Sequence, residues 1–182
     1  MQIFQTIQNA ISAENWTHAE RHLRQWCKQK NAPAQAFYNL AKVLEKQDKH
    51  EQAEIWLKRA IAIDNGYVSA IFELGRYETL FGKMDRAFRL LKRAKSLAPH
   101  DEDVLNLYYQ VAIGLGKWAD AYEVLQQLPQ SVKIRASLYR VKCELGLLDE
   151  RSRSTWIKEA SNAEMLQVVS RVSKGTLPFS GF

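Results

Sequence analysis

Two histidines, His18 and His22, come nearest in this chain to the type and spacing of a metal site. A separation of four residues puts both imidazoles on one face of a helix, an arrangement that zinc ligands can adopt. The pattern offers no third ligand, because Cys27 lies nine residues after His18, about 180° round the same helix. We therefore expect a partly exposed helix surface here, and neither a metal nor a cofactor.

The sequence pattern pairs no nucleophile with a base. Cys143 lies in a helical pattern with no neighbouring histidine. Gly82-Lys83 returns as Gly116-Lys117, which marks the dipeptide as a repeated turn and not as a phosphate-binding loop. The acidic run 101–103 stands at an expected helix start, where carboxylates cap free amide groups. We therefore do not expect an enzyme.

One helical stretch is strongly basic, as a site for a polyanion would be. It holds Arg86, Arg89, Lys92, Arg93 and Lys95. A nucleic acid held there through its phosphates would lose affinity as the salt concentration rises. Phe88 is the one aromatic residue within the run, whereas proteins that bind single strands offer several rings for bases to stack on. Nucleic-acid binding is therefore the weaker interpretation, and a solvated outer helix face is the stronger one.

The composition is ordinary for a folded domain, with 46% hydrophobic and 25% charged residues in a chain of 182. The formal charge of +6 permits an acidic partner without requiring one. The sequence contains no uncharged apolar run of about 18 residues that could span a membrane, and its N-terminus lacks the regions of a secretory signal. We therefore expect a cytoplasmic protein whose two cysteines form no disulfide framework.

The elements that would position any site follow a repeat. Its interval is the spacing from Ala53 to Ala87, which equals the spacing from Ala87 to Ala121. Further positions share this interval: Leu57, Leu91 and Leu125; Leu40 and Leu74; Ala60 and Ala94; Gly82 and Gly116; and Lys49, Lys83 and Lys117. A fixed period of this length indicates one supersecondary unit stacked several times, which is typical of a solenoid and not of a globular enzyme core.

Each unit reads as two helices. In residues 34–67, apolar and small residues from Phe37 to Leu44 have the spacing of one helix face, and a second such face follows the break at 48–49. Asn65-Gly66 then ends the second helix, because these two residue types tolerate a left-handed backbone. The small residues of the repeat should let the two antiparallel helices approach closely, while the leucines fill the space between pairs.

This pattern resembles the tetratricopeptide repeat (TPR) family. Residues 34–67, 68–101 and 102–128 give the clearest repeats, although Tyr109 replaces a small residue in the third. The flanks, 1–33 and 132–172, resemble degenerate or capping helix pairs. The resemblance implies an all-α, right-handed superhelical solenoid of about five stacked antiparallel helix pairs, forming one domain over residues 1–172.

In this family the first helix of each pair lines a concave groove that binds a segment of another protein. The residues at the matching places are Phe4, Tyr38, Phe72 and Asn106 in one row, and Lys42, Arg76 and Gln110 in the next. An aromatic row beside a basic row would suit a peptide that offers apolar side chains and carboxylates. The alternative is that the aromatic residues pack between helices and that the cations are solvated. The resemblance thus implies a protein-interaction module acting as an adaptor, scaffold or assembly factor.

A familiar use of the family is to clamp the acidic C-terminus of heat-shock chaperones. That clamp needs basic and amide groups at groove positions, where this sequence has Glu73 and Leu107. A carboxylate at position 73 would repel the carboxylates of such a partner. We therefore do not expect a chaperone clamp.

The final residues, 173–182, break the helical pattern with Pro178 and two glycines, so a non-helical tail is expected. Its apolar residues Leu177, Phe179 and Phe182 would pack on the solenoid or on another chain, unless the tail is a frayed terminus. A self-assembling scaffold held together through this tail is therefore a second alternative to peptide binding.

Overall fold

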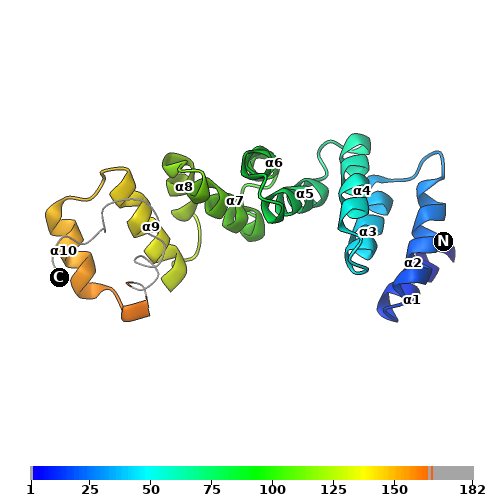
Figure 1. Cartoon of the computed structure of the whole chain (residues 1–182), viewed down its shortest axis with the longest axis horizontal. Helices are drawn as coiled ribbons and strands as arrows, with labels where there is room; N and C mark the ends of the chain where they lie inside the picture. Colours follow the sequence, from blue (N-terminus) through cyan, green and yellow to red (C-terminus); the bar gives the residue numbers. More distant parts are fainter. Residues whose placement is uncertain (1, 164, 166–182) are drawn as a thin grey trace. The chain divides into compact units, whose positions relative to one another are not determined.

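A computed structural model gives the fold of the chain and describes residues 2–163 and 165 (Figure 1). In this part of the chain all regular structure is helical, which confirms the all-α class. The ten helices are α1 (Gln2–Ser12), α2 (Trp16–Cys27), α3 (Ala34–Glu45), α4 (His50–Ile63), α5 (Val68–Leu80), α6 (Met84–Leu97), α7 (Glu102–Gly114), α8 (Trp118–Leu125), α9 (Val132–Glu144) and α10 (Glu150–Glu159). The predicted tail at 173–182 and the end of the last predicted helix pair lie outside the described residues.

The helices form two compact units, Met1–Pro99 with α1 to α6 and His100–Phe182 with α7 to α10. We call them unit 1 and unit 2. Within unit 1, each helix packs on the next one along the chain, from α1 to α6, and in unit 2 the same holds from α7 to α9. The helix pairs expected from the repeat are therefore present, while one continuous solenoid over residues 1–172 stays a prediction.

Four turns that recur at the repeat interval share one backbone conformation. Glu14, Asp48, Gly82 and Gly116 all have positive φ, with values of 52°, 56°, 72° and 68°. The residue after each of them is the N-cap of the next helix: Asn15, Lys49, Lys83 and Lys117. The register of the repeat therefore extends to the first helix pair, where the sequence resemblance was weak.

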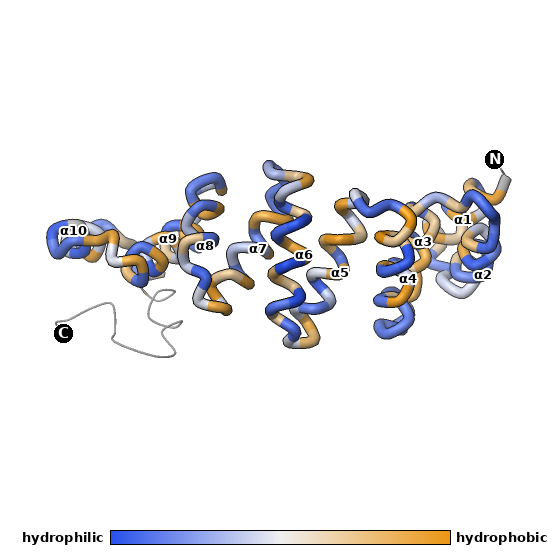
Figure 2. Tube along the Cα trace, turned by 90° about the horizontal axis from the view of Figure 1, so that it is seen from above, coloured by the Kyte–Doolittle hydropathy of each residue, from blue (hydrophilic) through white to orange (hydrophobic). Residues whose placement is uncertain are grey.

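The small residues of the repeat mark the closest approaches between paired helices. Ala53, Ala87 and Ala121 are fully buried. A Cβ atom added to Gly75 on α5 would lie 3.0 Å from both Cγ and Cδ2 of Leu91 on α6. Figure 2 shows hydrophilic and hydrophobic residues alternating along α6, as expected for a helix with one buried face. The steric explanation of the repeat is therefore confirmed at the α5–α6 contact.

Unit 2 departs from the repeat at Tyr109, as the sequence indicated, and at the end of the second helix of the α7–α8 pair. Tyr109 is fully buried and fills the position that a small residue occupies elsewhere. The second helix of this pair, α8, ends early at Leu125, four residues before Pro129. Beside Tyr109, the buried Tyr108 donates its hydroxyl to Oδ1 of Asp120 at 2.6 Å and so ties α7 to α8.

Across the described part of the chain, every helix is too short or too polar to cross a bilayer.

Candidate functional site

Four charged residues on α3 and α5 form a closed ion-pair cluster in unit 1. Nζ of Lys42 lies 2.6 Å from Oε2 of Glu45 and 3.1 Å from Oε1 of Glu73. Nη2 of Arg76 lies 2.7 Å from Oε2 of Glu73 and also contacts Glu45. Two cations are thus matched by two carboxylates. The predicted basic row is present on these helices, but its charge is neutralised within the protein.

Electrostatics within this α3–α5 ion-pair cluster favour the charged forms. Burial would raise the pKa of Glu45, but hydrogen bonds from Lys42 and Arg76 outweigh it and hold that pKa below its usual value. Burial would likewise lower the pKa of Lys42, and the carboxylates of Glu45 and Glu73 raise it instead. Glu45 and Lys42 therefore carry opposite charges near neutral pH.

The lowered pKa of Glu45 predicts a loss of stability in acid. The pKa of Glu45 is lower in the folded chain than the ordinary 4.5. The contribution of the Glu45 carboxylate to the free energy of unfolding is therefore present above pH 4.5 and disappears as the pH falls through the folded-state pKa. We expect the free energy of unfolding, measured in urea between about pH 6 and pH 3, to fall less steeply in Glu45→Gln than in the wild type. The control Glu51→Gln removes an exposed carboxylate from α4 and should keep the wild-type slope. Equal slopes in all three proteins would contradict the prediction.

The predicted aromatic residues of unit 1 are partly exposed. The ring of Tyr38 packs edge-on against Tyr67, with centroids 5.5 Å apart, and touches the core of the unit. Phe72 is half-buried, and Phe4 is 40% exposed with its ring edge-on to Trp26. The rings of Tyr38 and Phe4 therefore contribute to packing and still offer surface to a ligand, so the two interpretations of these residues are compatible.

A depression of about 500 Å³ lies between α1 and α3. Phe4, Gln35 and Asn39 line it, and all three stand on the helices that the repeat assigns to a groove. The lining also includes amide residues of α1 that the sequence analysis did not single out, among them Gln5 and Gln8. All of its lining residues are uncharged. Amide side chains both donate and accept hydrogen bonds, so this surface can pair with a peptide backbone.

The remaining predicted residues, Asn106 and Gln110, lie on α7 of unit 2. Nδ2 of Asn106 donates to the carbonyl oxygen of Glu102, and Nε2 of Gln110 donates to that of Asn106, each at 2.8 Å. One donor of each amide is therefore used within the helix itself.

Among the described residues, the two histidines of the candidate metal site have no third metal-binding side chain beside them. His18 and His22 approach each other to 2.6 Å between their Nε2 atoms. Among the described residues, no group of three or more His, Cys, Asp and Glu side chains is placed to hold a metal ion. Cys27 and Cys143 are both free and half-buried, and burial raises the pKa of Cys27 to about 11.

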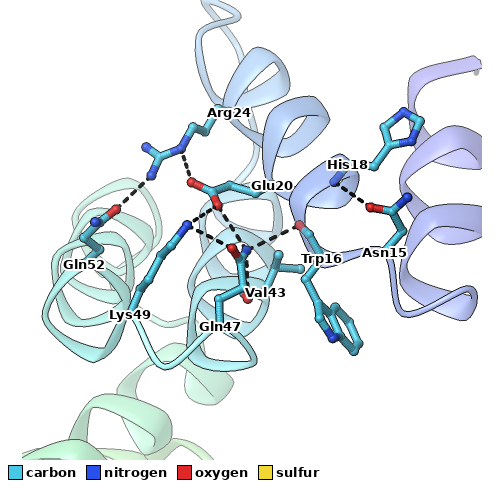
Figure 3. A network of polar contacts seen from close by, with 9 residues as sticks. All are labelled: Asn15, Trp16, His18, Glu20, Arg24, Val43, Gln47, Lys49 and Gln52. Carbon is cyan, nitrogen blue, oxygen red and sulfur yellow. Dashed lines mark hydrogen bonds and ion pairs between the residues drawn. The ribbon is translucent and has the colours of Figure 1, made fainter.

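A polar network joins α2 to the turn before α4 and to the start of α4 (Figure 3). The carboxylate of Glu20 accepts from Arg24 at 2.7 Å, from Lys49 at 2.8 Å and from Gln47 at 3.0 Å. Arg24 also donates to Oε1 of Gln52 on α4 at 2.9 Å. Every cation of this α2–α4 network thus has an acceptor in the fold.

Family comparison identifies the repeat in two stretches. Residues 34–67 and residues 80–141 each match a model described as tetratricopeptide repeat. A comparison with curated proteins gave no match.

Several solved structures share the fold. A tetratricopeptide repeat protein from Parabacteroides merdae is 15% identical, with a TM-score of 0.71 over 93% of this chain and 70% of that one. A MamA structure from Desulfovibrio magneticus is also 15% identical, with a TM-score of 0.68 over 94% and 96% of the two chains. A chain of Naa15/Naa10 bound to HypK-THB is 18% identical with a TM-score of 0.67 over 88% of this chain, and 25% of its own length is covered. Identities this low establish similarity of fold alone.

Proposed function

The chain belongs to the tetratricopeptide repeat family, and we propose that it binds a segment of a partner protein on the face of unit 1 formed by α1, α3 and α5. The observation that carries this proposal is the position of the α1–α3 depression. It lies on the same helices as the aromatic residues Phe4 and Tyr38, and Lys42 of the ion-pair cluster stands one turn beyond Tyr38 on α3.

The chemistry of this face indicates what kind of segment it accepts. Amides such as Gln35 and Asn39 suit the backbone of a peptide, while the exposed parts of Tyr38 and Phe72 suit its apolar side chains. Because the α3–α5 ion-pair cluster is internally neutral, a strongly acidic segment would have to displace its carboxylates. We therefore infer a mainly apolar and polar segment with few charges.

The chain would then act as an adaptor, scaffold or assembly factor and not as an enzyme. Lys42 and Arg76 would contact the segment as members of a fixed ion-pair cluster, and Asn106 and Gln110 are candidate contacts of unit 2. Self-assembly through residues 173–182 and a cytoplasmic location stay predictions from the sequence.

Loss of the two central rings should weaken binding to a segment selected for this protein. Peptides can be selected on the purified protein from a displayed random library, and their dissociation constants measured by calorimetry. We expect Tyr38→Ala combined with Phe72→Ala to weaken binding by at least about tenfold, because aromatic anchors supply much of the energy of an interface. The far-UV circular dichroism should stay near that of the wild type.

The matched control removes apolar surface from α4. Ile55 and Ile63 are 51% and 50% exposed there, so Ile55→Ala combined with Ile63→Ala should leave the affinity within about twofold. If the control weakens binding as much as the aromatic pair does, or if the aromatic pair has no effect, the proposed face is wrong.

A further inference from the structure

A second face of unit 1 gathers cations around a depression of about 430 Å³ between α4 and α6. Lys58, Arg86, Arg89 and Arg93 line it, together with Leu90 and Glu78. The lining thus contains four cations and a single carboxylate. The α3–α5 ion-pair cluster, by contrast, matches each cation with a carboxylate.

The repeat shows how this excess of positive charge arises. Glu54, Lys58 and Lys83 stand one repeat interval after Glu20, Arg24 and Lys49 of the α2–α4 network. The pairing along the helix is kept, since Lys58 bonds Glu54 as Arg24 bonds Glu20. The acceptor on the next helix is not kept, because the position equivalent to Gln52 is Arg86. A second cation thus replaces the amide that accepts from Arg24 in the first network.

Two further contacts around the depression leave this excess in place. Arg93 donates to the backbone carbonyl of Asn65, which carries no charge. Glu78 is 3% exposed, and its Oε2 lies 3.6 Å from Nζ of Lys83, a cation outside the lining. The buried carboxylate therefore already faces a cation of its own.

The remaining cations of the depression are Arg86 and Arg89. Neither forms a hydrogen bond or ion pair with any described residue, and both are exposed. The hydrogen bond from Lys58 holds the pKa of Glu54 below its usual value, and the charge of Arg86 adds to this effect without direct contact. Two guanidinium groups three residues apart on one helix face are thus available to a ligand.

We propose that this α4–α6 depression binds closely spaced carboxylates of an acidic protein segment. Guanidinium groups pair with carboxylates through two parallel hydrogen bonds, which favours such a segment over one of neutral polar residues. A single-stranded nucleic acid would need rings for its bases. The depression is lined by no aromatic residue, and Phe88, the aromatic residue of the basic run, is 8% exposed. The cations of this site lie on α4 and α6, whereas α1, α3 and α5 form the proposed peptide-binding face.

The test measures fluorescence anisotropy with a short labelled peptide of alternating aspartate and serine. The protein should bind it with an affinity that falls as the salt concentration rises, and a peptide with asparagine in place of aspartate should bind at least about tenfold more weakly. Arg86→Gln combined with Arg89→Gln should weaken binding of the acidic peptide by at least about tenfold. Both side chains are exposed, so circular dichroism should show an unchanged fold.

Two control proteins separate this site from general charge effects. Lys28→Gln combined with Lys30→Gln removes the same charge from exposed positions of unit 1 and should leave the affinity within about twofold. Tyr38→Ala combined with Phe72→Ala should bind the acidic peptide like the wild type, whether or not the other face binds peptides. The proposal is overturned if the two charge variants lose affinity equally, or if the asparagine peptide binds as well. It is also overturned if a thymidine oligonucleotide, and not the acidic peptide, depends on Arg86 and Arg89.

Discussion

Replacing Gly75 by leucine should lower the free energy of unfolding of unit 1 by about 3 kcal/mol. A Cβ at this position would already lie 3.0 Å from two side-chain atoms of Leu91, and the remaining atoms of a leucine have no free volume at that contact. The helices α5 and α6 would have to move apart. Urea unfolding followed by circular dichroism measures the loss.

A double-mutant cycle identifies the contact responsible. Leu91 is fully buried, so Leu91→Ala alone should cost about 2–5 kcal/mol by leaving a cavity. The double variant should lose at least about 1 kcal/mol less of its free energy of unfolding than the two single variants lose together, because the leucine at position 75 occupies that cavity. Gly114→Leu is the control, since a Cβ at Gly114 on α7 would meet nothing within 4 Å, and it should be close to neutral. Additive costs for Gly75 and Leu91 would contradict this account of the repeat.

Removal of the Trp156 side chain should release α10 from unit 2. The rings of Trp156 and Tyr139 stack with centroids 3.8 Å apart and planes inclined by 13°. The other members of this small apolar cluster are Ala136, Cys143 and Leu148. Beside the stack lies an open depression of about 510 Å³, which both α9 and α10 line. We expect Trp156→Ala to speed amide hydrogen exchange in residues 150–159 by at least about tenfold.

The remainder of unit 2 should keep its protection in that experiment. The core around α7 and α8 does not depend on Trp156, because Tyr108 and Tyr109 are buried within it. Ile157→Ala is the matched control, since this neighbouring side chain is 37% exposed, and its exchange pattern should be that of the wild type. Fast exchange throughout α7 and α8 in Trp156→Ala would show that α10 is part of the main core instead.

The helices were predictable because the repeat interval relates each buried position to the equivalent position in the next repeat. Ala53 and Leu57 belong to helix faces that the spacing alone identifies. The turns at Glu14 and Asp48 were harder to predict, because glutamate rarely adopts a left-handed backbone and aspartate adopts it less readily than glycine does. Glycine at the equivalent positions of the later repeats predicts the same turn directly.

The candidate site was predictable in position but not in charge. Lys42 and Arg76 stand on the expected helices, yet their neutralisation depends on α3 and α5 lying side by side, which brings together residues 31 apart in the sequence. The signal that was available is the spacing of three residues from Lys42 to Glu45 and from Glu73 to Arg76, which is typical of ion pairs on helices. The α1–α3 depression could not be predicted, because the amide residues of α1 form no motif.

The face of α1, α3 and α5 can be tested most directly by photo-crosslinking. A benzophenone amino acid placed at Gln35, which is exposed and lines the depression, should crosslink to a bound selected peptide, while the same group at the exposed Ile55 on α4 should not. Mass spectrometry of the crosslinked products locates the contact. Efficient crosslinking from Gln35 alone is the result that our proposal predicts. Crosslinking from Ile55 and none from Gln35 would contradict it.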